Sequence, residues 1–177
     1  MIVKKILYAQ KAIDASLSQM ADDILSRFPQ PPVLVGIRRG GLVICDRLGQ
    51  LLSHRGGNPV PIGVVDINLY RDDWTMARSF PKVGRTEICF GLDDRRVVLV
   101  DDVLYTGRTV RAALEALTEF GRPRRIELAI LVDRGRREMP IQPDYVGLTM
   151  ETSAEEMVEV RFSEAANGDE IVLLGPK

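Results

Sequence analysis

Short runs of consecutive apolar residues alternate along the chain with longer stretches whose apolar residues recur every three or four positions. Uninterrupted runs of Val, Ile and Leu are typical of parallel strands that are covered on both faces. The expected strands lie at 33–37, 61–69, 97–100, 126–132, 145–147, 157–162 and 171–174. Helical periodicity predicts helices at 12–28, 42–52 and 109–120.

The order of these elements predicts the fold class. Strands that alternate with helices favour an α/β fold with a mostly parallel, doubly wound sheet. A chain of 177 residues is long enough to bury one hydrophobic core, and no linker or low-complexity segment divides it. We therefore expect one domain over residues 1–177.

Residues 70–94 form the longest stretch without a clear period, and it is rich in charged side chains. A charged segment of this length inside a compact domain is uncommon, and is usually functional or disordered. The run 86–90 could pair as a strand, which would make the region a two-stranded flap.

Polar clusters follow three of the expected strands, at 38–41, 101–109 and 133–137. In parallel sheets of this kind, ligands bind at the carboxyl ends of the strands. The three clusters are therefore expected to converge on one active site.

The cluster at 101–109 has the most specific chemistry. Asp101 and Asp102 precede a turn that contains Thr106 and Gly107, and a helix follows. Main-chain N–H groups at a helix start attract anions, whereas the carboxylates suit hydroxyl groups or a metal that bridges to phosphate. These residues predict a ligand with sugar hydroxyls on one side and a phosphate on the other. The alternative, a simple helix cap, does not need two consecutive aspartates.

The sequence excludes two other nucleotide-binding motifs, and its charge, cysteines and apolar runs limit the partners and the cellular location. The chain has neither a Gly-Lys-Ser/Thr P-loop nor a Gly-x-Gly-x-x-Gly turn. A formal net charge of −1 gives no global attraction to nucleic acid. Cys45 and Cys89 show no metal-ligand spacing, which favours reduced thiols and a cytoplasmic protein. No apolar run approaches the roughly 20 residues of a membrane helix, so we expect no membrane partner.

The segment Val98–Val110 resembles the signature of type I phosphoribosyltransferases, which forms their site for 5-phosphoribosyl-1-diphosphate (PRPP). The segments 66–73, 102–109 and 131–135 are similar to those of the PyrR family, bifunctional pyrimidine-operon attenuators and uracil phosphoribosyltransferases. The resemblance runs from about Ile13 to Val172.

The resemblance implies a role for each matching position. Asp101 and Asp102 would hold the ribose hydroxyls and support Mg²⁺ on PRPP, and Arg39 and Arg71 would complete the catalytic set. The implied PRPP and nucleotide site comprises Arg38, Arg39, Gly40, Gly41, Arg85, Asp101, Asp102, Val103, Leu104, Tyr105, Thr106, Gly107, Arg108 and Thr109.

The same resemblance implies a flexible loop at about 70–94 and a hood over the base. The hood would consist of residues from about 133 to 177 together with N-terminal residues. Its implied base-side positions are Val132, Asp133, Arg134, Arg137 and Val158. Purine-specific members of the superfamily have an aspartate where this chain has Tyr105, which favours a pyrimidine base.

The implied activity converts uracil and PRPP to UMP and diphosphate. The resemblance also implies a homodimer or larger oligomer, and UMP- or UTP-dependent binding to the leader mRNA of a pyrimidine operon. The candidate RNA contacts are Arg27, Arg136 and Arg137, since the first helix otherwise presents residues such as Asp14, Gln19 and Asp22. The alternatives are a phosphoribosyltransferase without an RNA-binding role, or one that acts on a purine base.

Overall fold

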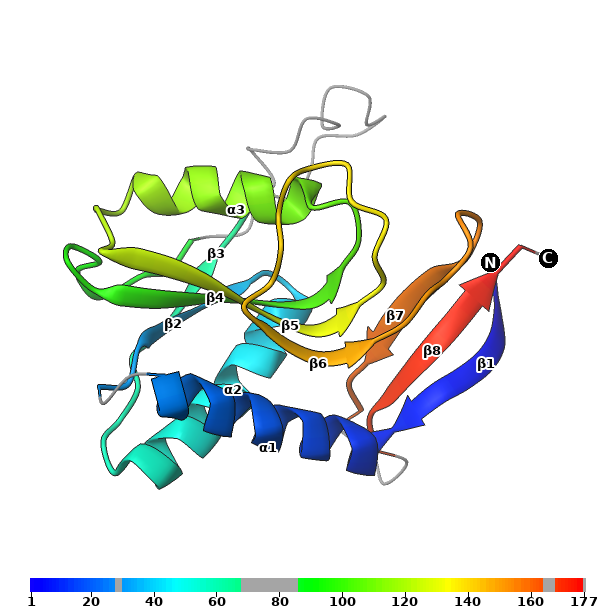
Figure 1. The fold of residues 1–177 in the computed structure, drawn as a ribbon, viewed down its shortest axis with the longest axis horizontal. Helices are drawn as coiled ribbons and strands as arrows, with labels where there is room; N and C mark the ends of the chain where they lie inside the picture. Colours follow the sequence, from blue (N-terminus) through cyan, green and yellow to red (C-terminus); the bar gives the residue numbers. More distant parts are fainter. Residues whose placement is uncertain (28–29, 68–85, 164–167, 177) are drawn as a thin grey trace.

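A parallel sheet with helices on both faces forms the body of the molecule (Figure 1). The computed structural model describes residues 1–27, 30–67, 86–163 and 168–176. The five-stranded sheet has the order β3–β2–β4–β5–β6. Its strands are β2 (Val33–Ile37), β3 (Ile62–Val65), β4 (Arg96–Leu104), β5 (Arg125–Asp133) and β6 (Tyr145–Thr149). Helices α1 (Gln10–Arg27) and α2 (Gly40–Gly56) cover one face, and α3 (Arg108–Thr118) covers the other.

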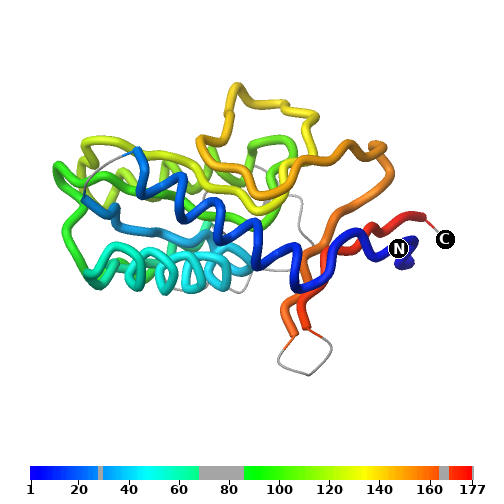
Figure 2. Tube along the Cα trace, turned by 60° about the horizontal axis from the view of Figure 1, so that its bottom comes forward, coloured from blue at the N-terminus to red at the C-terminus, as the bar shows by residue number. Residues whose placement is uncertain are grey.

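A separate three-stranded antiparallel sheet has the order β1–β8–β7. It consists of β1 (Ile2–Ala9), β8 (Glu170–Gly175) and β7 (Met157–Arg161), and brings the two ends of the chain together (Figure 2). The apolar pattern did not predict β1 as a strand. Its side chains are largely exposed, so β1 is defined by its pairing with β8, for example Ile6 opposite Val172.

The core lies in two layers on either side of the parallel sheet. Successive residues of β4 point to opposite faces. Val98 belongs to the cluster beneath α1 and α2, whereas Leu99 belongs to the cluster beneath α3. Both are fully buried, and full burial of one such side chain contributes about 1.5–3 kcal/mol. The central strand is therefore a rigid support for the loop that follows it.

The predicted α/β fold is confirmed, with differences at the boundaries. The second helix begins at Gly40 rather than at residue 42, and β4 continues through both aspartates. Residues 86–90 do not form the strand that the sequence allowed. Within this run only Glu87 pairs, through a single antiparallel bridge to Val64. Within the described residues, no helix has the length and apolarity needed to cross a bilayer.

Candidate active site

The loops after β2, β4 and β5 lie side by side because these strands are neighbours in the sheet. Gly36 pairs with Val100, and Leu104 pairs with Asp133. The N–H of Arg134 also donates to the Leu104 carbonyl over 3.0 Å. The three polar clusters thus meet at one edge of the sheet, where ligands bind in this class of fold.

Asp101 and Asp102 occupy the last half of β4 and differ in exposure. Asp101 is 5% exposed, whereas Asp102 is half-buried. Asp101 Oδ1 accepts the Asp102 N–H over 3.0 Å, and Asp102 Oδ1 accepts the Val103 N–H over 2.8 Å. Burial, reinforced by the charge of Asp102, raises the pKa of Asp101 well above its ordinary value. Asp102 is therefore the more accessible carboxylate of the pair.

Gly40 and Gly41 place the start of α2 directly against these aspartates. A Cβ atom on Gly40 would collide with the Asp102 carboxylate, and one on Gly41 would collide with the Val100 carbonyl. Glycine is required at both positions because the main chain approaches so closely. The Arg38–Arg39 peptide bond that leads into this contact is cis.

Two helices begin at the site, and the residue before each of them makes no side-chain capping hydrogen bond. At the start of α3, the Arg108 N–H donates over 3.5 Å to Thr106 Oγ1. Arg39 precedes α2, and Gly107, at φ 92°, precedes α3. The first N–H groups of a helix have no partner within the helix, and the helix dipole adds partial positive charge there. The site therefore offers two anion-binding ends, with the two aspartates beside them.

The two arginines after β2 have different surroundings. Arg38 forms ion pairs with the buried Asp66 at 3.7 Å and with Glu87 at 3.6 Å. Arg39 is exposed, and its guanidinium has no partner among the described residues. Arg39 is thus the arginine available to a ligand at the start of α2.

Tyr105 is held by two arginines from the loop after β5. The Arg134 guanidinium lies 4.0 Å from the centre of the Tyr105 ring, a cation–π distance. Arg137 donates to the Tyr105 carbonyl over 3.1 Å and to the Asp133 carboxylate over 2.7 Å. Burial alone would raise the pKa of Asp133, but the contacts with Arg137 and the Gly135 N–H outweigh it and lower that pKa.

The turn before α3 is braced from the same side. The Thr106 carbonyl accepts the N–H groups of Glu138 and Met139 over 2.9 and 3.0 Å. Arg108 donates to the Glu138 carboxylate over 2.7 Å. Leu104 is buried beneath α3, Val103 is half-buried, and Thr109 lies half-buried in the first turn of α3. The loop is therefore fixed before any ligand arrives.

Comparison with known proteins identifies the family. Residues 4–176 match the phosphoribosyl transferase domain. The bifunctional protein PyrR of Desulfosudis oleivorans is 47% identical over 169 residues, covering 94% of this chain and 93% of that protein. The PyrR protein of Deinococcus radiodurans is 43% identical over 176 residues, covering 98% and 96%. The chain belongs to the PyrR family of phosphoribosyltransferases.

Solved structures show the same fold at lower sequence identity. A Trypanosoma cruzi hypoxanthine phosphoribosyltransferase superposes with a TM-score of 0.72 at 18% identity, over 97% of this chain and 91% of that chain. A Bacillus anthracis hypoxanthine-guanine phosphoribosyltransferase gives 0.68 at 18% identity, over 97% and 98%. The predicted type I fold and the predicted membership of the PyrR family are confirmed.

Two arginines predicted for the site lie outside the described residues, and two valines predicted for it are buried in the core. Arg71 and Arg85, with residues 70–85 of the predicted loop, lie outside the described residues. Val132 and Val158 are buried in the core cluster that also contains residues of α1 and α2.

The three residues predicted to bind RNA do not form one surface on a single chain. Arg27 lies against Asp144 and 4.6 Å from the centre of the Tyr145 ring. Arg136 and Arg137 follow the carboxyl end of β5. The partners of Arg27 are instead level with Leu128 and Ala129, in the middle of that strand. Arg137 is largely buried by its contacts, whereas Arg136 is exposed.

Sequence reasoning did not single out Thr152 as a functional residue. It is 9% exposed, and its Oγ1 accepts two hydrogen bonds from Arg134, over 3.0 and 2.8 Å. No motif marks Thr152, because its partner is distant in the sequence. For Asp66, the sequence gives a weak indication of a functional role, since it is an isolated carboxylate directly after the apolar residues Val64 and Val65.

Proposed function

We propose that the protein transfers the phosphoribosyl group of PRPP to a ring nitrogen of uracil, giving UMP and diphosphate. The observation that carries this proposal is the pair of helix starts, of α2 and α3, that lie beside the two aspartates of β4. PRPP has a phosphate at one end, a diphosphate at the other and ribose hydroxyls between them. Its charges match this arrangement of donors and carboxylates.

Each part of PRPP has a suitable partner. The N–H groups at the start of α3, with the hydroxyls of Thr106 and Thr109, would bind the 5-phosphate. The start of α2 and the Arg39 guanidinium would bind the diphosphate. The ribose hydroxyls would then donate to the carboxylates of Asp101 and Asp102.

The reaction needs no nucleophile from the protein. The bond from the ribose carbon to the diphosphate oxygen breaks, a bond to the uracil nitrogen forms, and that nitrogen loses its proton. The sugar carries positive charge in such a transition state, which the nearby carboxylates stabilise. Arg39 and the α2 N–H groups stabilise the charge that develops on the diphosphate.

The residues fit a Mg²⁺ ion that arrives with the substrate. The described part of the chain contains no group of three or more side chains that could form a metal cage. Mg²⁺ typically uses one or two carboxylates, retains waters and binds substrate phosphates, so Asp102, with Asp101 behind it, would hold it. When bound, the ion would neutralise charge on PRPP.

A pyrimidine fits the base side better than a purine. Tyr105 provides no carboxylate, and its ring is covered by Arg134. The nearby Asp133 carboxylate is engaged by Arg137 and the Gly135 N–H. Neither residue thus offers an unengaged carboxylate to a purine ring nitrogen, which supports uracil over a purine.

The direct test is an assay of purified protein with PRPP and Mg²⁺, with uracil, hypoxanthine or guanine as acceptor. We expect UMP and diphosphate from uracil, and negligible product from either purine. Asp102→Asn should lower kcat/KM for PRPP at least about a hundredfold. Turnover of a purine without turnover of uracil would refute the proposed substrate.

We also propose that the protein acts in the cytoplasm as a regulator that binds pyrimidine-operon leader mRNA, at least as a dimer. Its membership of a family of bifunctional proteins supports this, and the exposed Arg136 is the favoured RNA contact. Filter binding of leader RNA should strengthen with UMP and weaken in Arg136→Ser. Nucleotide-independent binding, or sedimentation as a strict monomer, would contradict this second function.

A further inference from the structure

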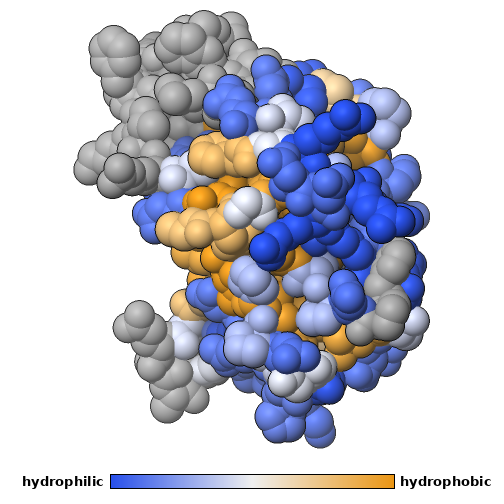
Figure 3. All heavy atoms as spheres, turned by 90° about the vertical axis from the view of Figure 1, so that its left-hand side faces the viewer, coloured by the Kyte–Doolittle hydropathy of each residue, from blue (hydrophilic) through white to orange (hydrophobic). Residues whose placement is uncertain are grey.

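A basic pocket lies at the amino ends of the parallel strands, on the edge opposite the candidate active site. Figure 3 shows the molecule from this side, with strongly hydrophilic side chains crowded around an exposed apolar area. The pocket has a volume of about 420 Å³, within the size range of small-molecule sites. Its lining residues are Gln30, Pro31, Val33, Asp94, Arg95, Arg96 and Arg124.

Positive charge predominates in the lining, which has three arginines and one carboxylate. Arg95 and Arg124 are exposed. Neither guanidinium has a hydrogen bond or ion pair with the part of the chain that the structure describes. A guanidinium presents a planar fork of donors that matches phosphate geometry. Two such groups at one pocket favour an anionic ligand.

Hydrogen bonds between two loops hold these arginines in place. The Arg124 N–H donates to the Arg95 carbonyl over 2.9 Å, and the Asp94 N–H donates to the Arg122 carbonyl over 3.1 Å. The Arg122 N–H in turn donates to Asp93 over 2.6 Å. Binding an anion would therefore require little main-chain ordering, which reduces the entropic cost of association.

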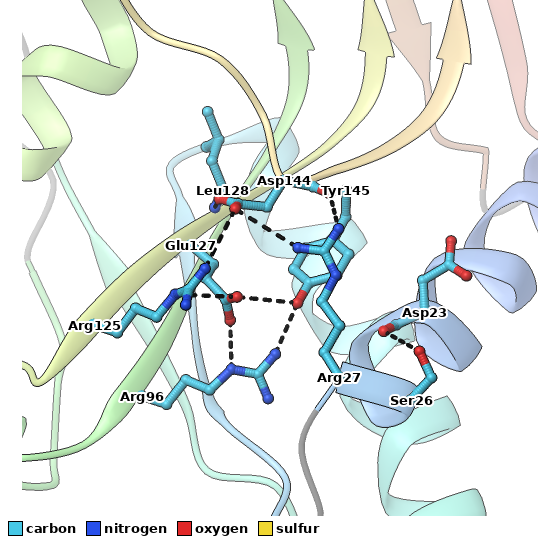
Figure 4. Close-up of polar contacts among 9 residues, drawn as sticks. All are labelled: Asp23, Ser26, Arg27, Arg96, Arg125, Glu127, Leu128, Asp144 and Tyr145. Carbon is cyan, nitrogen blue, oxygen red and sulfur yellow. Dashed lines mark hydrogen bonds and ion pairs between the residues drawn. The ribbon is translucent and has the colours of Figure 1, made fainter.

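A buried polar network behind the pocket engages Arg96, the third arginine of the lining (Figure 4). Glu127 is 1% exposed and pairs with Arg96 and Arg125. The Tyr145 hydroxyl accepts from Arg96 over 2.8 Å and donates to Glu127 over 3.3 Å. The buried carboxylate is thus engaged by inner groups, and Arg95 and Arg124 stay outside this network.

We propose that this pocket binds a small phosphorylated anion, either free phosphate or the phosphate group of a nucleotide. Arg95 and Arg124 would contact the phosphate oxygens, and Pro31 and Val33 would form the apolar wall. The site is separate from the active site, since β4 carries the chain roughly 17 Å from Arg96 to Asp101. The proposal does not depend on the proposed activity.

The test is a titration of the ¹⁵N-labelled full chain, followed by amide chemical shifts at constant ionic strength. The probes are sodium phosphate, UMP and uridine. We expect saturable shifts at residues 94–96 and 124–125 with phosphate and with UMP, but none with uridine. Amides at 106–110 report the active site separately. Tighter binding of UMP would identify a nucleotide ligand, and equal affinities would identify free phosphate; either result supports the site.

Variants that remove either positive or negative charge from the lining make the test sharper. The double variant Arg95→Ser/Arg124→Ser should weaken binding about tenfold or more. Asp94→Asn should strengthen it, because it removes the carboxylate from the lining and Asn tolerates the positive φ of 56° at that position. Lys5→Ser/Lys11→Ser removes the same charge elsewhere and should leave binding unchanged.

The proposal fails if phosphate and UMP give no saturable shifts at 94–96 and 124–125. It also fails if the shifts persist in the arginine double variant, or if uridine reproduces them. A dispersed amide spectrum of the double variant shows that it is folded, so a loss of binding then reports the pocket itself.

Discussion

Arg134 stacks on Tyr105, with the guanidinium carbon 4.0 Å from the ring centre. The same guanidinium donates to Thr152 Oγ1 and, over 2.6 Å, to the Glu156 carbonyl. One buried side chain therefore joins the loop before α3 to the segment that enters β7. Burial lowers the pKa of Arg134 from its ordinary value, and the acceptors around it compensate for the lost hydration.

Thr152→Val should destabilise the protein by about 1–3 kcal/mol, because Arg134 would lose an acceptor inside the fold. The KM for uracil should rise as well, since only the bond from Arg134 to the Glu156 carbonyl would still tie the hood to the Tyr105 loop. Urea unfolding and initial-rate kinetics measure the two effects. Thr149→Val is the matched control, because Thr149 is exposed on β6. Equal behaviour of the two variants would contradict the proposed link.

Gly40→Ala should lower kcat/KM for PRPP at least about tenfold, or about 1.4 kcal/mol. The new methyl group would collide with the Asp102 carboxylate. Gly40 is the first residue of α2, so the higher helix propensity of alanine contributes little there. Lost activity in a protein that is still folded would identify the collision. Gly91→Ala is the control, since no atom lies within 4 Å of its added Cβ. Full activity of Gly40→Ala would show that the close contact is not needed.

Arg39→Ala should raise the KM for PRPP about tenfold or more while changing the unfolding free energy by less than about 0.5 kcal/mol. Arg38→Ala should lower stability by about 0.5–3 kcal/mol, because Arg38 pairs with the buried Asp66. Lys11→Ala, an exposed charge on α1, serves as the control for both measurements. The reverse pattern would assign the diphosphate contact to Arg38.

Asp101→Asn should make the folded protein more stable at pH 7 while lowering activity. The pKa of Asp101 is raised in the folded state, so its contribution to stability falls as pH rises above the unfolded-state value of about 3.8. Asparagine keeps the hydrogen bond to the Asp102 N–H but cannot ionise. Urea unfolding at pH 3.5 and pH 7 should show a stabilisation that grows with pH. A stabilisation equal at both values would refute this account, and Asp102→Asn, at a less buried site, is the comparison.

The two cysteines should react very differently with a thiol reagent. Cys89 is exposed, whereas Cys45 is buried in α2, where burial raises the pKa of its thiol. In native protein, one thiol per chain should react rapidly, and the second only after a denaturant is added. Rapid reaction of both thiols, or of Cys45 in a Cys89→Ser variant, would show that the α2 packing opens readily.

The strands of the parallel sheet and the helices that cover it could be predicted because each has a characteristic pattern of apolar positions. Uninterrupted apolar runs such as Val97–Val100 and the helical spacing of α1 are local signals that burial on both faces requires. The strand β1 could not be predicted, since its exposed residues and two lysines show no buried face. It is a strand because β8 supplies its hydrogen bonds.

The sequence alone determined the chemical groups that the ligand must contain. Two consecutive aspartates and a turn of threonine and glycine before a helix specify sugar hydroxyls and phosphate wherever the fold places them. Their approach to Gly40, the different surroundings of Arg38 and Arg39, and the stacking of Arg134 on Tyr105 depend on tertiary structure. Each joins segments on different strands, and contacts between distant segments leave no periodic trace in the chain. The sequence alone therefore determined the chemistry of the ligand, and the packing of β2, β4 and β5 decided which side chains are free to contact it.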